Sequence, residues 1–164
     1  MGFLKRLINP TESAAAPTER TTTLAASARP MRSALLALNA EREELDPGRA
    51  EMDLRALVID LLRGEVAAPT SDVTRLVRSG IDADAFYDKE IARSWEGLGE
   101  NQRAARVEQF AGLAAMLEDA GEDERPPNYD QMLATVRTKT LVLSFAFDET
   151  YGYIRRIERD EQLG

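Results

Sequence analysis

The chain has 164 residues, of which 43% are hydrophobic and 30% are charged, and its formal net charge is -8. This composition is typical of one folded soluble domain. The sequence has no cysteine and no histidine, which excludes disulfides, thiolate metal sites, cysteine nucleophiles and the commonest general base. A body this acidic repels phosphate backbones, so we expect no nucleic-acid partner.

A short amphipathic peptide, residues 2–9, begins the sequence and ends at Pro10, which cannot continue a helix. Lys5 and Arg6 form its polar side. A peptide of this kind docks into a partner groove or rests weakly on an anionic membrane surface. The alternative is an ordinary frayed N-terminus, because two turns do not hold a helix unaided. Its apolar side chains are Phe3, Leu4, Leu7 and Ile8.

Residues 10–30 are mostly Ala, Thr, Ser and Pro, and we expect them to be a disordered, flexible linker because they bury too little apolar surface to offset ordering. The net charge is +2 over residues 1–30 and -10 over the remainder. The predicted order is therefore a peptide (residues 1–9), a linker (10–30) and an α-helical domain (31–164). The apolar start is too short for a secretion signal, and no run reaches membrane-spanning length. We expect a cytoplasmic location, with peripheral membrane contact as an alternative.

The body is predicted to be all-α, a bundle of about five to six helices. It begins with residues 31–45, whose apolar residues are Leu35, Leu36, Leu38 and Leu45. Asp46 and Pro47 have the residue types of an N-cap and a first helical position, and Gly64 is a natural helix stop. Between them the apolar residues recur with a period of 3.6 residues, at Leu54, Leu57, Val58, Leu61 and Leu62.

Three further helices are expected before the C-terminal one. Residues 69–72 open the first, which Gly80 closes, and Asp82 caps the second. The third covers about residues 100–120. Their expected inward side chains are Val73, Leu76 and Val77, then Phe86, Tyr87, Ile91, Trp95 and Leu98, then Val107, Phe110, Leu113, Ala114 and Leu117.

The C-terminal helix is predicted over residues 129–161, because apolar residues recur in steps of three and four once Thr140 and Thr150 fill the two gaps. A β-hairpin over residues 138–157 is the competing interpretation, since that stretch is rich in β-branched and aromatic residues. Residues 141–147 are apolar almost all round, which indicates a helix central to a core or sandwiched between partners. The periodic positions are Tyr129, Leu133, Val136, Leu143, Phe147, Ile154 and Ile157.

We expect the rest of the chain to be too small to cover this helix, and hence a non-enzymatic protein–protein interaction module. It would be an accessory or scaffolding subunit that docks through this helix onto a protein partner or a second copy, with the N-terminal peptide as a further candidate contact. A peripheral membrane protein and a carboxylate-based enzyme are the alternatives. The candidate interaction residues are Leu141, Val142, Leu143, Phe145, Phe147 and Tyr151, with Phe3, Leu4, Leu7 and Ile8 in the peptide.

Several motifs fail on their residue types, so we expect no metal or cofactor. A calcium loop starting at Asp82 needs glycine and glutamate where Tyr87 and Arg93 stand. A DNA-reading helix over the same segment would begin with four acidic residues. A di-iron bundle would add histidine to its glutamates.

Overall fold

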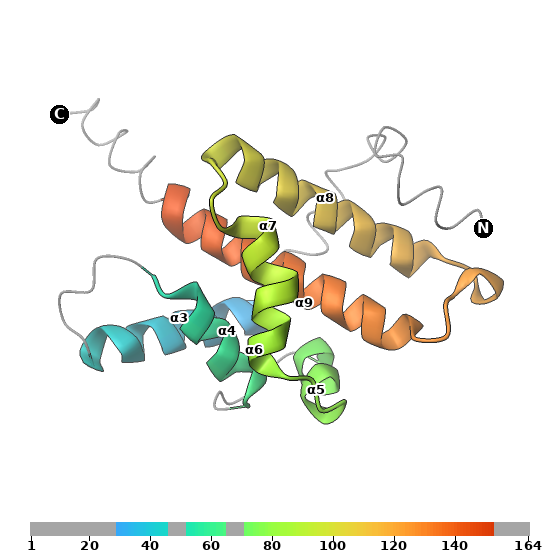
Figure 1. Cartoon of the computed structure of the whole chain (residues 1–164), viewed down its shortest axis with the longest axis horizontal. Helices are drawn as coiled ribbons and strands as arrows, with labels where there is room; N and C mark the ends of the chain where they lie inside the picture. The colour runs from blue at the N-terminus through green and yellow to red at the C-terminus, as the bar shows by residue number, and fades with distance from the viewer. Residues whose placement is uncertain (1–28, 46–51, 65–70, 153–164) are drawn as a thin grey trace.

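The computed structural model describes residues 29–45, 52–64 and 71–152, which form helices and the turns between them (Figure 1). Because α6, η2 and α7 run on without a break, these residues make six helical rods, which confirms the all-α bundle with a long C-terminal helix. The α-helices are α3 (Arg29–Leu45), α4 (Leu54–Leu62), α5 (Ser71–Arg78), α6 (Ala83–Phe86), α7 (Arg93–Trp95), α8 (Glu100–Asp119) and α9 (Tyr129–Phe147). Two π-helical segments, η2 (Tyr87–Ala92) and η4 (Asp148–Gly152), and a 3-10 turn, η3 (Glu122–Glu124), complete the described fold.

Local capping groups explain where several helices begin and end. Asp82 accepts a hydrogen bond from the Ala85 amide at 2.8 Å, as its residue type predicted. Gly80 ends α5 with a φ of +73°, a conformation that costs other residues free energy. The described start of α4 is capped by Asp53, whose side chain accepts from the Ala56 amide at 3.0 Å. The predicted cap at residues 46–47 lies outside the described residues.

Helix α9 runs through the middle of the bundle. It packs against α8 on one side, while α3, α4 and α5 gather on the other side and the α6–α7 rod crosses it (Figure 1). Its helical conformation continues through η4 to Gly152, so the hairpin interpretation is wrong for residues 138–152. Residues 153–161 of the predicted helix lie outside the described residues. Other helices enclose its long apolar run on several sides, as a helix that is apolar almost all round requires.

Two large apolar side chains that the sequence pattern grouped with the core are exposed in the structure. Val77 was expected to face inward and is 37% exposed. It follows the buried Leu76 directly, so it points roughly 100° away from it round the helix. Leu36 on α3 is 42% exposed, next to the buried Leu35, for the same reason. On each of these helices, the face that is buried in the core is therefore narrower than the face that the apolar residues cover.

The two π-helical segments were not predicted from the sequence. Each turn of a π-helix holds an extra residue, and such turns are frequent at functional sites. In this structure both carry long-range polar contacts. Glu90 of η2 bonds to α9, and Glu149 of η4 accepts a hydrogen bond from Arg32 of α3 at 2.8 Å. The π-turns therefore present side chains to distant helices.

Candidate functional site

The predicted interaction residues of the C-terminal helix lie inside the protein's own core. Leu143 is 0% exposed, and its neighbours on α9 are buried with it. The expectation that the chain cannot cover this helix is therefore wrong, because α3, α5, η2 and α8 all pack on α9. The buried members are Leu141, Val142, Leu143 and Phe145.

The remaining predicted interaction residues divide between the edge of the bundle and the undescribed N-terminus. Phe147 and Tyr151 are half-buried, with ring centroids 4.8 Å apart. The Tyr151 hydroxyl also lies 3.3 Å from Arg103 Nη1 and accepts its hydrogen bond. These two rings therefore close the end of the α8–α9 pair. Phe3, Leu4, Leu7 and Ile8 lie outside the described residues.

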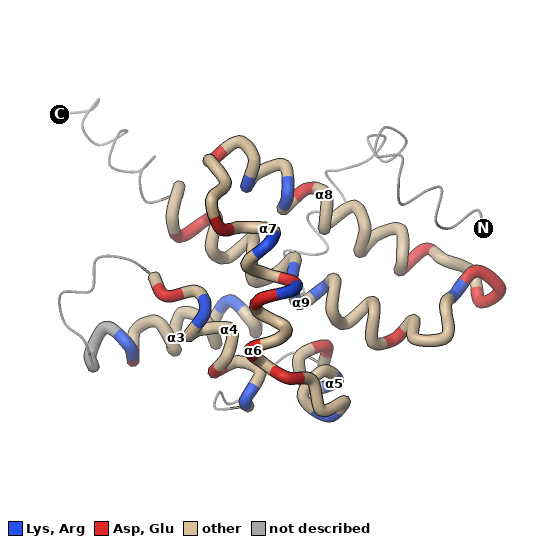
Figure 2. Tube along the Cα trace, viewed as in Figure 1, with Lys and Arg blue, Asp and Glu red and all other residues tan. Residues whose placement is uncertain are grey.

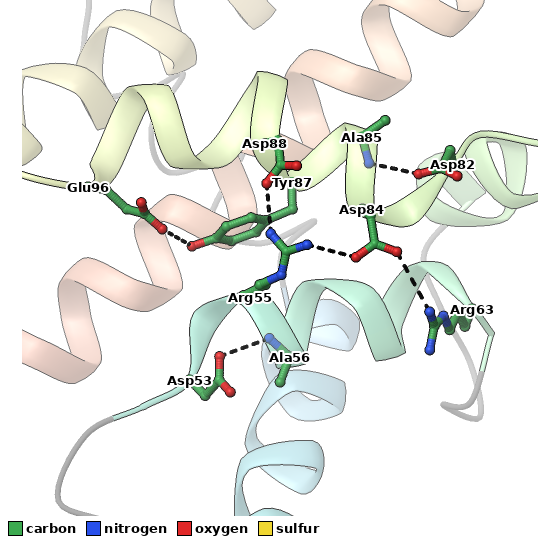
Figure 3. A network of polar contacts seen from close by, with 10 residues as sticks. All are labelled: Asp53, Arg55, Ala56, Arg63, Asp82, Asp84, Ala85, Tyr87, Asp88 and Glu96. Atoms are coloured by element: carbon green, nitrogen blue, oxygen red, sulfur yellow. Dashed lines mark hydrogen bonds and ion pairs between the residues drawn. The ribbon is translucent and has the colours of Figure 1, made fainter.

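Arg55 is the centre of a polar network on the described surface (Figure 3). Its two terminal nitrogens donate to Asp88 Oδ1 at 2.7 Å and to Asp84 Oδ1 at 2.8 Å. The two carboxylates stand one helical turn apart on the α6–η2 rod, so one guanidinium on α4 reaches both. The hydrogen bond to Asp88 raises the pKa of Arg55 above its ordinary value. The network holds α4 against the α6–η2 rod.

Tyr87 lies beneath the Arg55 guanidinium, which is 5.2 Å from the ring centroid. Its hydroxyl donates to Glu96 Oε1 at 2.8 Å, and the residue is almost completely buried (Figure 3). Burial raises the pKa of Tyr87 well above its usual range, and the hydrogen bond to Glu96 adds to the increase. The phenol is therefore a hydrogen-bond donor at neutral pH and not a general base.

A lysine lies in the interior at the junction of three helical elements. Lys139 on α9 is 9% exposed, and its Nζ donates to Glu90 Oε2 of η2 at 3.2 Å. The same Nζ lies 4.0 Å from the centroid of the Phe110 ring on α8. An ammonium ion that leaves water needs partners of this kind, namely a carboxylate and an aromatic face. These contacts join α9 to η2 and to α8.

A third charged cluster joins α5, α8 and α9. Arg137 Nε donates to Glu118 Oε1 at 2.8 Å, and its Nη1 lies 3.6 Å from Asp72 Oδ1. Burial raises the pKa of the Asp72 carboxyl, while the charge of Arg137 opposes the increase. Each of the three clusters therefore spans two or more helices and stabilises their packing.

A shallow depression of about 510 Å³ lies between the end of α5 and the loop before α9. The charged groups around it are already engaged. Arg125 lies 4.6 Å from the Tyr129 ring centroid and donates to the Ala120 carbonyl, and Arg75 pairs with Asp130 at 3.7 Å. The depression has no set of converging free polar groups that would mark a catalytic cleft.

The sequence did not single out Arg55, Tyr87 or Lys139 as network members. One signal was present for Lys139, since this lysine stands between two threonines directly before the apolar run of residues 141–147. Its carboxylate partner comes from a segment 49 positions earlier, which no local pattern indicates. Within the described ranges, no group of three or more acidic residues is arranged to hold a metal ion. No described helix combines the length and the apolarity needed to cross a bilayer.

Comparison with known proteins finds no protein-family model, no curated protein and no solved structure that matches this chain.

Proposed function

We propose that this chain is a non-enzymatic protein–protein interaction module, an accessory or scaffolding subunit that reaches its partner through residues 2–9. The proposal is supported by the contrast between the packed acidic helical body and the sequence of residues 2–9, which is short, basic and amphipathic and precedes the predicted linker. Lys5 and Arg6 give the peptide its positive charge, while residues 31–164 carry most of the chain's negative charge. This is the arrangement of a tethered docking peptide.

The packing of the body supports docking through the peptide more than through the C-terminal helix. Leu143 and its neighbours already contact other helices of the same chain. Among the described residues, the exposed large apolar side chains are Leu36 and Val77. They stand on different helices, whereas a stable protein interface needs a contiguous buried patch.

The chemistry of the peptide specifies its partner. Four large apolar side chains on one side of a two-turn helix fit a hydrophobic groove, and two adjacent cations fit a rim of carboxylates. The expected partner is therefore a protein with an apolar groove and an acidic edge. Basic and acidic positions are interspersed along the helices of the body (Figure 2), and several of their side chains form ion pairs with each other. Such a surface keeps the body soluble while the peptide binds.

The experiment compares capture and binding by three forms of the full chain. The wild type is compared with Phe3→Asp/Leu7→Asp and with Thr21→Asp/Thr22→Asp, which adds the same charge within the linker. A captured protein is purified, and its affinity for each form is measured by calorimetry. We expect the peptide variant to lose at least about tenfold in affinity, or about 1.4 kcal/mol, and the linker variant to match the wild type. Equal affinity of all three forms would overturn the proposal.

Two further measurements separate the other possible partners. Light scattering at micromolar concentration detects a second copy of the chain, and peptide-dependent dimerisation would make the partner the protein itself. Flotation with phosphatidylserine vesicles tests the membrane alternative. Two basic and four apolar residues bind a membrane only weakly, so we expect the protein to stay in the soluble fraction. Peptide-dependent flotation without any protein partner would replace the proposal with the membrane alternative.

A further inference from the structure

The rod formed by α6, η2 and α7 has one buried side and one exposed side. Phe86, Ile91 and Trp95 are buried and belong to the same core cluster. Lys89 and Arg93, which lie between them in the sequence, are exposed. The three apolar side chains must therefore point to the same side of the rod.

A regular α-helix would not bring these side chains together. Successive residues turn by about 100° round a helix, so Phe86 and Trp95, which are nine positions apart, would point to opposite sides. The π-turn η2 lies between them and holds one residue more than an α-turn. Phe86 and Trp95 therefore point like two residues eight positions apart in a regular helix, whose directions differ by roughly 80°. The π-turn thus keeps both rings in the core.

A hydrogen bond across the π-turn has the same geometry. Tyr87 and Glu96 are also nine positions apart, and the Tyr87 hydroxyl donates to Glu96 Oε1 at 2.8 Å. In a regular α-helix, two such side chains would start from opposite sides. The apolar pair and the polar pair therefore indicate the same correction, by one residue, of the helix register.

Glu90 is the residue of η2 that carries charge into the core. Its neighbours Asp88 and Lys89 are exposed on the other side of the rod. Glu90 Oε2 accepts a hydrogen bond from Lys139 Nζ at 3.2 Å, and Lys139 is 9% exposed. A buried ammonium that lacks a carboxylate partner is strongly destabilising. Glu90 is therefore the member of the turn on which the interior depends.

We propose that η2 is a register device, which adds Glu90 to the rod as the counter-ion of Lys139 without turning Trp95 out of the core. A rod shorter by this one residue would be a regular helix with Phe86 and Trp95 still on one side, because they would then be eight positions apart. The added residue therefore serves the buried ammonium and not the apolar core. The inference concerns the helical body and does not depend on the docking role proposed for residues 2–9.

The test deletes Glu90 in the full chain, alone and together with Lys139→Met, which removes the charge that needs a partner. Lys139→Met alone completes the double-mutant cycle. Deletion of Glu108 is the control, because this residue is exposed in the middle of the regular helix α8, where a lost residue turns Leu117 away from the core by about 100°. Urea unfolding gives the midpoint of each form. Trp95 is the only tryptophan of the chain, so its fluorescence emission and its quenching by acrylamide report whether it stays buried.

We expect deletion of Glu90 alone to lower the urea midpoint by about 1 M, because it leaves the ammonium of Lys139 unpaired. The double variant should regain at least half of that loss and keep the wild-type emission and quenching of Trp95. Deletion of Glu108 should abolish cooperative unfolding.

Three results would overturn the inference. An exposed Trp95 in the double variant would mean that the rod had lost its register. Equal midpoints of the single deletion and the double variant would mean that the added residue does not serve Lys139. A second version of the double variant carries Lys139→Leu, and failure of both versions to fold would mean that the rod cannot lose one residue.

Discussion

Lys139 Nζ and Glu90 Oε2 lie 3.2 Å apart and join the central helix α9 to the π-turn η2. The two ends of this pair have different surroundings. The lysine side chain is 11% exposed, whereas the glutamate side chain is 37% exposed. Removing the glutamate charge should therefore lower the free energy of unfolding more than removing the lysine charge. Only the glutamate is readily hydrated when it loses its partner.

The first prediction follows from this asymmetry. Glu90→Gln leaves a buried ammonium with only a neutral amide and the Phe110 ring, and should lower the free energy of unfolding by about 2 kcal/mol. Lys139→Met removes the charge and keeps the apolar stem, so it should cost less than about 1 kcal/mol. Urea denaturation of both variants measures the difference. If Lys139→Met is as destabilising as Glu90→Gln, the pair does not have this asymmetry.

The second prediction concerns Arg55. Arg55→Gln removes the cation shared by Asp84 and Asp88 and leaves two like charges one turn apart on the rod. The urea midpoint should fall at low salt, and the difference from wild type should shrink in 1 M NaCl, where the screening length is about 3 Å. Arg63→Gln is the control, because its contact with Asp84 is long, at 3.8 Å, and its loss should have little effect. A salt-independent loss would assign the role of Arg55 to packing on Tyr87.

The third prediction is a pH dependence at Tyr87. Burial raises the pKa of its phenol in the folded protein, so the protonated form stabilises the fold fully below the unfolded pKa of about 10. That contribution is lost as pH rises above 10. Tyr87→Phe should be about 1 kcal/mol less stable at pH 8, because it lacks the hydrogen bond to Glu96. The difference in the free energy of unfolding between the wild type and Tyr87→Phe, measured by urea unfolding, should be smaller at about pH 10.5. An unchanged difference would contradict the prediction.

The fourth prediction compares two leucines of opposite environment. Leu143→Glu puts a carboxylate among fully buried side chains and should cost more than about 4 kcal/mol, which would unfold most of a small domain. Leu36→Glu changes a side chain that is 42% exposed and should stay within about 0.5 kcal/mol of wild type. Thermal melts followed by circular dichroism measure both. A folded, stable Leu143→Glu protein would contradict the described core.

Local interactions account for the parts of the fold that were predicted from the sequence. The 3.6-residue periodicity of α4, the aspartate that caps α6 and the glycine that ends α5 each act within a few residues of chain. The groups that interact therefore stand close together in the sequence, where a local pattern can reveal them. The exposed positions of Leu36 and Val77 were missed, because periodicity shows which residues are apolar but not how wide a face the neighbouring helices cover.

The amino-acid sequence by itself determined the helical class, most helix ends and the exclusion of histidine and cysteine chemistry. Only the tertiary structure decided the environment of the C-terminal helix. Residues 141–147 have the same apolar pattern whether a second protein or their own bundle encloses them, and the packing of α8, α5 and α3 on α9 decides between the two. The partner of Lys139 was likewise beyond sequence reasoning. A contact between positions 49 residues apart depends on how whole helices cross, and that geometry results from summed packing over the entire core.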